Sequence, residues 1–347
     1  MKISTPFFCA ALGLVTWSCD SVDGLEAGSG GQSSTGGVDG AGGGELTDTG
    51  GRSNASGGET ADATGGETSA GGNPTGSGGD GSGGSGTGGV AGDGVVKSAG
   101  CGKANPPTGS VGSPLTVSGH QYYVKLPASY DPDTAYPVLM VFHPTGNPID
   151  WAEKSAGYEA TSAKDEAIRV YPHSSGSGWE ATDVTFFAPF HEQILSDFCV
   201  DETRVFAAGE SSGGDFAGVI GCEHADKLRA IAPCATKPVS GYPLDAGSRN
   251  CTGQVASIVI HGKNDNVVGT ANAEPLKNFY REVNHCDETG DPVEGYTDTL
   301  SNCVKYQGCD EGFPVYFCYH TDPEYSGTNH GWPKFAGKMT WATFSEY

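Results

Sequence analysis

The residues with the clearest potential for chemistry are a serine between two glycines. The segment GESSG, residues 209–213, is the only G-x-S-x-G match in the chain. The pattern before it predicts a buried strand at Arg204–Ala208, and the pattern after it predicts a helix from Ser212 to about Glu223. A strand that turns sharply into a helix at such a serine is a nucleophile elbow. We therefore predict that Ser211 is a nucleophile; the alternative is an ordinary serine in a tight turn.

A nucleophilic serine needs a base, and the base needs a carboxylate that orients it. In chains with this kind of elbow the three groups follow in the order Ser, Asp or Glu, His. The segment IVIHGKNDNVV places Asp265 in the loop after a predicted strand, where catalytic groups gather in open α/β sheets. The segment TNHGWP places His330 in a loop between the last predicted strand and the last predicted helix. We predict a triad of Ser211, Asp265 and His330.

Other acids and histidines fit these roles less well. Asp215 follows Ser211 on the predicted helix, where we expect a solvated face, and no strand leads into the polar loop of Asp287 and Asp291. We expect His261 to help shape the turn that holds Asp265. Two further histidines stand in less suitable places: His285 lies near a helix end, and His320 lies at a strand end, where a structural histidine is the alternative.

The loop after an early strand should supply part of an oxyanion hole. That loop reads HPTGN, residues 143–147, and its proline has no N–H to donate. Thr145 is therefore the predicted backbone donor, together with the N–H of Ser212; the alternative is a plain Pro/Gly loop. Two aromatic residues near these motifs, Trp179 and Trp332, are predicted substrate contacts, with a place in the core as the alternative.

Short apolar runs alternate with helical patterns through the core. We predict strands at 121–126 (an edge strand), 137–143, 168–171, 204–208, 230–233, 257–260 and 315–319, and helices at 183–198, 212–223, 273–283 and 334–344. Strands that alternate with helices favour a mainly parallel sheet covered on both faces. The predicted fold class is therefore α/β.

The N-terminal part of the chain differs in composition from the rest. Residues 1–19 form a basic and then apolar segment that ends at Cys19, which predicts an export signal of the lipoprotein type with Cys19 lipidated; plain secretion is the alternative. Residues 20–95 are rich in Gly and Ser and predict a disordered tether. We predict one catalytic domain over residues 96–347 and a secreted or cell-surface location.

Charge and cysteine content limit the function classes. A formal net charge of −23 disfavours binding to nucleic acid. Nine of the 11 cysteines lie in the predicted domain, and no paired C-x-x-C motifs suggest a zinc site. With the export signal, these cysteines predict at least three disulfides and at least one cysteine outside them. We expect no metal, no cofactor and a monomer.

With these residues placed, the core resembles secreted esterases of the feruloyl esterase and polyhydroxybutyrate depolymerase group, most of all the cysteine-rich feruloyl esterases. The likeness rests on SAGCGK, FCVDETRVFAAGESSGG, HGKNDNVV, YQGCDEGFPVYF and NHGWP, and on Gly178-Trp179. It implies an α/β-hydrolase fold, a Ser-His-Asp mechanism without metal, and the same triad. Six cysteines look like the family's set: Cys101, Cys199, Cys222, Cys251, Cys286 and Cys309.

The chain departs from this family at the oxyanion loop and in three cysteines. Paired glycines are usual where HPTG stands, and Cys234, Cys303 and Cys318 look additional. The resemblance implies cleavage of hydroxycinnamoyl esters of plant polysaccharide. The alternatives are a polyhydroxybutyrate depolymerase, an acetyl xylan esterase, or a surface lipoprotein that binds polysaccharide without catalysis.

The lipoprotein signal gives a first prediction. If Cys19 carries the lipid, the exported protein sediments with membranes, and Cys19→Ser releases it or blocks its maturation. Membrane fractionation followed by immunoblotting measures this. An unchanged membrane fraction in Cys19→Ser would rule out lipidation at that cysteine.

Overall fold

The computed structural model describes residues 94–236, 251–322 and 329–347. The predicted signal, Cys19 and all but the last residues of the predicted tether lie outside these ranges. Among the described residues, no helix is both long enough and apolar enough to cross a membrane.

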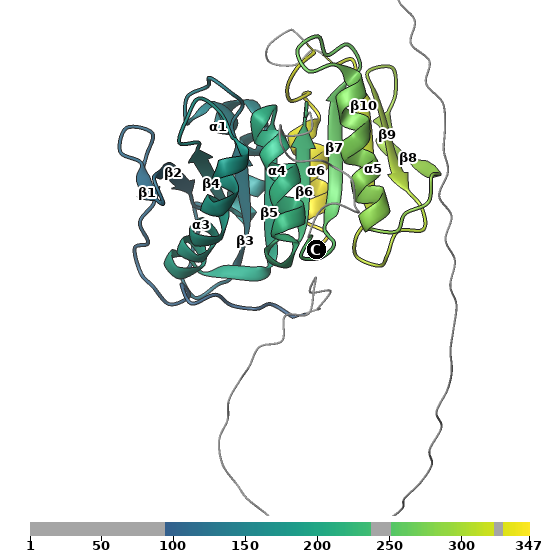
Figure 1. The fold of residues 1–347 in the computed structure, drawn as a ribbon. Helices are drawn as coiled ribbons and strands as arrows, with labels where there is room; N and C mark the ends of the chain where they lie inside the picture. Colours follow the sequence, from purple (N-terminus) through teal and green to yellow (C-terminus); the bar gives the residue numbers. More distant parts are fainter. Residues whose placement is uncertain (1–93, 237–250, 323–328) are drawn as a thin grey trace, which may run out of the picture. The chain divides into compact units, whose positions relative to one another are not determined.

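The described residues form strands and helices that alternate along much of the chain (Figure 1). The strands are β1 (Leu115–Val117), β2 (His120–Lys125), β3 (Tyr136–Phe142), β4 (Ile168–His173), β5 (Val200–Glu210), β6 (Ala230–Cys234), β7 (Ala256–Gly262), β8 (Gly290–Thr297), β9 (Ser301–Tyr306) and β10 (Val315–His320). The α-helices are α1 (Trp151–Ser155), α2 (Ala163–Glu166), α3 (Val184–Asp197), α4 (Ser212–Glu223), α5 (Ala273–Val283) and α6 (Ala336–Phe344). Short 3-10 turns lie at Tyr158–Ala160, Ala181–Asp183, Ala225–Lys227 and Thr270–Asn272.

All described strands belong to one sheet of order β1-β2-β4-β3-β5-β6-β7-β10-β9-β8. The six central strands, β4-β3-β5-β6-β7-β10, pair in parallel. The pairs on either side of them, β1-β2, β2-β4, β10-β9 and β9-β8, are antiparallel. The sheet is therefore mainly parallel, and the fold is that of an α/β-hydrolase. The carboxyl ends of β3, β5, β6, β7 and β10 consequently meet at one edge of the sheet.

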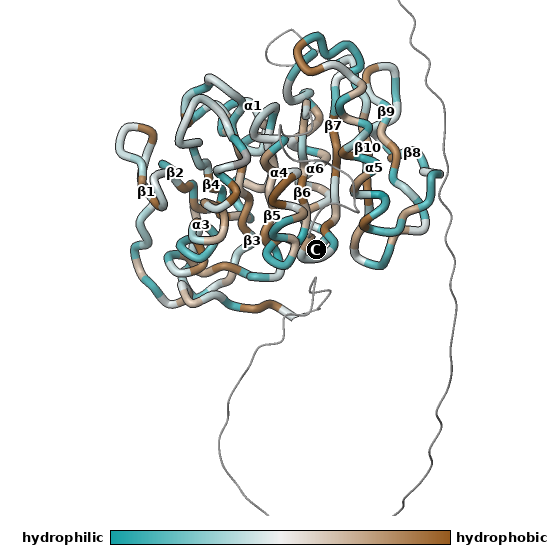
Figure 2. The backbone as a smooth tube through the Cα atoms, viewed as in Figure 1, coloured by the Kyte–Doolittle hydropathy of each residue, from teal (hydrophilic) through white to brown (hydrophobic). Residues whose placement is uncertain are grey.

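Helices cover both faces of this sheet. Successive residues of a strand point to opposite faces, so Met140 of β3 packs in a cluster with α3, α4 and α5, whereas Leu139 packs in a second cluster with α6. The hydrophobic residues concentrate along the central strands and α4 (Figure 2). Burial on both faces explains why the central strands are continuous apolar runs.

The prediction of an α/β fold with a mainly parallel sheet is confirmed, but three details were wrong. The strand predicted at 121–126 is not an edge strand, because β1 pairs with its outer side. The region of Asp291 is not a loop, since that residue lies in β8, which pairs with β9. Neither β8 nor β9 was predicted, because polar, largely exposed residues dominate β8 and leave little apolar alternation.

Four disulfides join the described cysteines. The six cysteines that match the family pair among themselves, and two of the additional ones, on the adjacent strands β9 and β10, form a fourth bond. Cys234 takes part in none of them. The prediction of at least three disulfides is confirmed. The bonds are Cys101–Cys199, Cys222–Cys251, Cys286–Cys309 and Cys303–Cys318.

Candidate active site

Ser211 occupies a sharp turn between β5 and α4. Its backbone has φ 54° and ψ −121°, a conformation that residues other than glycine rarely adopt. A Cβ on Gly209 would lie 2.1 Å from the carbonyl oxygen of Gly213, and a Cβ on Gly213 would lie 2.3 Å from that of Phe142. The turn is therefore possible only with glycine on both sides of Ser211, as an elbow requires.

Asp265 and His330 come together at the same edge of the sheet. Asp265 follows β7, and its side chain is fully buried. Nδ1 of His330 lies 2.9 Å from Oδ2 of Asp265, while Oδ1 accepts hydrogen bonds from the N–H groups of Val267 and Val268, at 2.9 Å each. Nδ1–H thus donates to the carboxylate, which makes Nε2 the ring nitrogen that can act as a base.

These contacts hold Asp265 as a carboxylate. Burial by itself would raise the pKa of Asp265, but hydrogen bonds from the Val268 N–H, the His330 ring and the Val267 N–H outweigh it and lower the pKa below its ordinary value. A charged carboxylate beside Nδ1 fixes the tautomer of His330. It also favours the protonated ring that forms when Nε2 accepts a proton.

Cys234, at the carboxyl end of β6, links the loop of His330 to the elbow. Its carbonyl oxygen accepts a hydrogen bond from the N–H of Ser211, at 2.9 Å. Its thiol donates to the carbonyl oxygen of Gly331, at 3.3 Å. Because Gly331 follows His330 directly, one residue contacts both the predicted nucleophile and the loop of the predicted base. Nothing in the sequence indicated this role of Cys234, which stood out only as a cysteine beyond the family's usual set.

The oxyanion-loop residue Thr145 and the helix residue Ser212 converge on Gly178. A Cβ on Gly178 would lie 2.4 Å from Oγ1 of Thr145 and 3.0 Å from Oγ of Ser212. Ser212 is the first residue of α4, where backbone N–H groups have no partner within the helix. The two residues predicted to form an oxyanion hole therefore lie close together. Gly178 was noticed only as part of the family likeness, and the structure shows that its lack of a side chain leaves room there.

His143 holds the start of the oxyanion loop. The ring is fully buried, its Nδ1 lies 2.7 Å from the Pro144 carbonyl oxygen, and its Nε2 accepts from the Ser174 N–H at 3.1 Å. This pattern places the ring proton on Nδ1. Burial lowers the pKa of His143 to about 4, so that the ring is neutral near pH 7. A neutral histidine thus connects the end of β3 to the segment that carries Gly178.

The two tryptophans predicted to contact substrate are buried. Trp179 is 5 % exposed, and its ring stacks on Phe216 at 4.6 Å between centroids. Its backbone N–H donates to Oγ of Ser212 at 3.4 Å. Trp332 is 3 % exposed and meets Tyr158 edge-on at 6.3 Å. Both rings belong to the core clusters of the described structure, and their contact with substrate stays a prediction.

The acids and histidines that the sequence analysis set aside take no part in the contact between His330 and Asp265. The expectation for one of them, Asp215, was wrong. Asp215 is not on a solvated face: it is 7 % exposed, because α4 is buried from Gly213 to Cys222. His285 is largely exposed and pairs with Asp310 at 2.7 Å. His320 is buried at the end of β10, as a structural histidine would be, and Asp287 is exposed.

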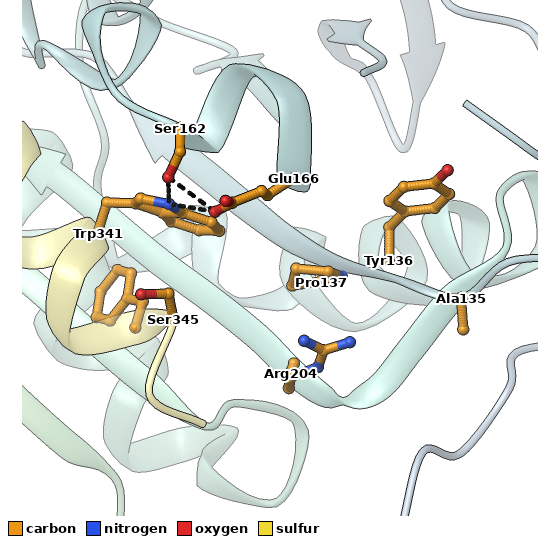
Figure 3. Close-up of a pocket in the computed structure, with 9 residues that line it drawn as sticks. Ala135, Tyr136, Pro137, Ser162, Glu166, Arg204, Trp341 and Ser345 are labelled. Carbon is orange, nitrogen blue, oxygen red and sulfur yellow. Dashed lines mark hydrogen bonds between the residues drawn. The ribbon is translucent and has the colours of Figure 1, made fainter. Parts of the chain in front are cut away.

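One cavity of the described structure lies away from this site (Figure 3). It has a volume of about 440 Å³, and its lining includes Tyr136 and Arg204, which lie toward the amino ends of β3 and β5. The indole N–H of Trp341 lies 3.0 Å from both Oγ of Ser162 and Oε2 of Glu166. These polar groups satisfy one another and join α6 to α2. Within the described ranges, no group of three His, Cys, Asp or Glu side chains is arranged to hold a metal ion.

Comparisons with known proteins point to one family. The chain is 28 % identical to feruloyl esterase D of Neurospora crassa over 274 residues, covering 73 % of this chain and 91 % of the relative. It is 30 % identical to feruloyl esterase C of Emericella nidulans over 265 residues, and 31 % identical to a probable feruloyl esterase C of Aspergillus niger over 262 residues, covering 72 % of this chain and 91 % of the relative in both cases.

A solved structure supports the fold. An acetyl xylan esterase from Aspergillus awamori superposes with a TM-score of 0.50 at 15 % identity, covering 65 % of this chain and 95 % of that chain. No protein-family model matches the chain.

The buried histidines predict a loss of stability in acid. Burial lowers the pKa of His143, His191 and His320 from 6.5 to about 4 each. The unfolded chain therefore binds more protons than the folded chain between those values, and the free energy of unfolding falls as the pH drops from about 6.5 to about 4. Each histidine contributes a slope of at most about 1.4 kcal/mol per pH unit. Urea unfolding at pH 7.5, 6 and 5 measures this; a free energy that stays constant or rises toward pH 5 would contradict it.

Proposed function

Because the chain belongs to the feruloyl esterase family and is a carboxylic ester hydrolase, we propose that it cleaves hydroxycinnamoyl esters of plant polysaccharide through an acyl-enzyme on Ser211. The observation that carries this proposal is the hydrogen bond from His330 to the buried Asp265, at 2.9 Å, in a loop that Cys234 links to the elbow of Ser211. This is the arrangement that a serine nucleophile needs: a base with a fixed tautomer and a carboxylate behind it.

The first half of the reaction acylates the enzyme. Oγ of Ser211 attacks the ester carbonyl carbon while Nε2 of His330 takes the hydroxyl proton. The carbonyl oxygen becomes an oxyanion, which the N–H groups of Ser212 and Thr145 stabilise. When the intermediate collapses, the bond to the sugar oxygen breaks, and the proton on His330 passes to that oxygen. The alcohol, a sugar hydroxyl, leaves, and the hydroxycinnamoyl group stays on Ser211.

The second half returns the enzyme to its starting state. A water molecule gives a proton to Nε2 of His330 and attacks the acyl carbon, and the oxyanion forms again at the same donors. The bond to Oγ of Ser211 then breaks, the serine recovers its proton from His330, and the hydroxycinnamic acid leaves. Asp265 stays a carboxylate throughout and stabilises the charged ring twice in each cycle.

Two observations favour an acylated polysaccharide over a water-insoluble polyester. The names of the relatives, at 28–31 % identity, all specify feruloyl ester cleavage. Binding to a hydrophobic polymer calls for a contiguous apolar surface. In the part of the chain that the structure describes, the large exposed hydrophobic residues instead come from four separate segments: Val95–Val96, Val111, Val267 and Leu300.

The same proposal includes a location outside the cytoplasm. The four disulfides suit an oxidising compartment. With the predicted signal and Cys19, they support an enzyme on the cell surface, held by a lipid at the end of the Gly- and Ser-rich segment. The proposal takes this enzyme to be a monomer. The tether would let the domain reach a polymeric substrate while it stays attached.

A side-by-side comparison of substrates tests the proposal. We expect kcat/KM to be highest on methyl ferulate and at least about tenfold lower on an acetylated xylan and on a soluble hydroxybutyrate oligomer, which corresponds to about 1.4 kcal/mol in transition-state binding. Ser211→Ala, purified in the same way, is the control for contaminating esterases and should be inactive on all three. A tenfold preference for either of the other substrates would refute the feruloyl assignment, and an active Ser211→Ala would refute the mechanism.

A further inference from the structure

A second histidine contacts the carboxylate of Asp265. His261 lies in β7, four residues before Asp265, and is 0 % exposed. Its Nε2 lies 3.5 Å from Oδ2 of Asp265, the oxygen that also receives Nδ1–H of His330. The side chain of His261 therefore approaches the carboxylate of Asp265 from within the sheet, while the side chain of His330 approaches it from the loop before α6.

The contacts of the carboxylate leave one acceptor position for His261. A carboxylate accepts about four hydrogen bonds, two on each oxygen. Oδ1 of Asp265 accepts from Val267 and Val268, and Oδ2 accepts from His330. The second position on Oδ2 is the one that Nε2 of His261 can fill. At 3.5 Å the contact is longer than an ordinary hydrogen bond, and such contacts in resting enzymes can shorten when charge develops.

The buried ring of His261 has few polar contacts besides the carboxylate of Asp265. Among the described residues, the backbone of Gly269 also acts on the ring of His261, although neither ring nitrogen has a hydrogen-bond partner of good geometry. A buried polar group without such partners costs free energy, and a phenyl ring would fill similar space without that cost. Burial lowers the pKa of His261, although the Asp265 carboxylate opposes the shift, so the ring is neutral and can carry its single proton on Nε2.

We propose that His261 is a positioning residue for Asp265, whose Nε2–H faces Oδ2 and holds the carboxylate toward His330. The inference rests on the proposed function, because it assigns a part within the same triad. The dipole of this N–H also moderates the negative potential that His330 experiences. Without it, Asp265 would stabilise the protonated form of His330 more strongly. A higher pH would then be needed before His330 could act as a base.

Few other titratable groups face this cluster. On the neighbouring strand β10, His320 pairs opposite Gly262, and its ring interacts electrostatically with His261 and Asp265. Asp322, in the segment after β10, acts on His320 and accepts a hydrogen bond from the backbone N–H of Lys334. His320 is buried like His261, but among the described interactions it acts on Asp265 only electrostatically, without a hydrogen bond or an ion pair to that carboxylate. It therefore serves as a matched control.

The test is the pH profile of kcat/KM for methyl ferulate in four variants. In His261→Phe we expect kcat to fall about tenfold with little change in KM, and the acidic limb of the profile to move to higher pH. His261→Gln, whose amide N–H can reach the same oxygen, should restore both toward wild type, whereas His261→Asn, with a shorter side chain, should not. His320→Phe should leave the acidic limb in place even if it lowers the melting temperature.

The outcomes separate this inference from the proposed function. An active Ser211→Ala would refute both the proposed mechanism and the role of His261. An inactive Ser211→Ala combined with a folded His261→Phe that keeps the wild-type kcat and acidic limb overturns only the role of His261. A shift of the limb in His320→Phe equal to that in His261→Phe also overturns it, because the effect would then come from packing. If His261→Phe does not fold, the Gln and Asn variants decide: equal profiles in the two contradict the inference.

Discussion

The rest of the site depends on the backbone of Ser211, which is held at φ 54° and ψ −121° between a strand and a helix. Such a conformation costs about 1–3 kcal/mol and persists only where the surrounding structure enforces it. Here β5 and α4 are both packed in the core, and the glycines at 209 and 213 approach other backbone atoms more closely than any side chain would allow. The strain keeps the serine side chain at the carboxyl edge of the sheet, where a base can approach it.

The parallel topology brings the other residues of the candidate site to the same edge of the sheet. Because β5, β6, β7 and β10 run in parallel, the segments after them meet at one edge, and each contributes one part of the site. β6 contributes Cys234, which contacts both Ser211 and the loop of His330. β7 leads to Asp265, whose burial strengthens its interaction with His330. The same geometry brings His261 and His320 to adjacent strands, which places several ionisable groups in a small buried volume.

The sequence predicted those features that depend on local pattern. The strands and helices form close to where their apolar patterns predict them, and the contact between His330 and Asp265 lies where the motifs place those residues. The catalytic roles of Ser211, Asp265 and His330 stay a prediction. Features that depend on tertiary contacts were missed. Asp215 follows the elbow on a helix that is buried around its whole circumference, which a polar residue does not reveal. β8 and β9 lack a strong apolar alternation, and the role of Cys234 arises only when β6 lies beside β5 and next to the loop of Gly331.

The central claim is that Ser211 is the nucleophile, and covalent labelling tests it most directly. The purified enzyme is treated with a fluorophosphonate, which reacts with activated serines, and the site of attachment is located by peptide mass spectrometry. The account predicts one phosphonyl group per chain, on Ser211, with loss of activity in proportion to labelling, and no labelling in His330→Ala. Full activity after labelling, or a label on another serine that tracks the loss of activity, would contradict it.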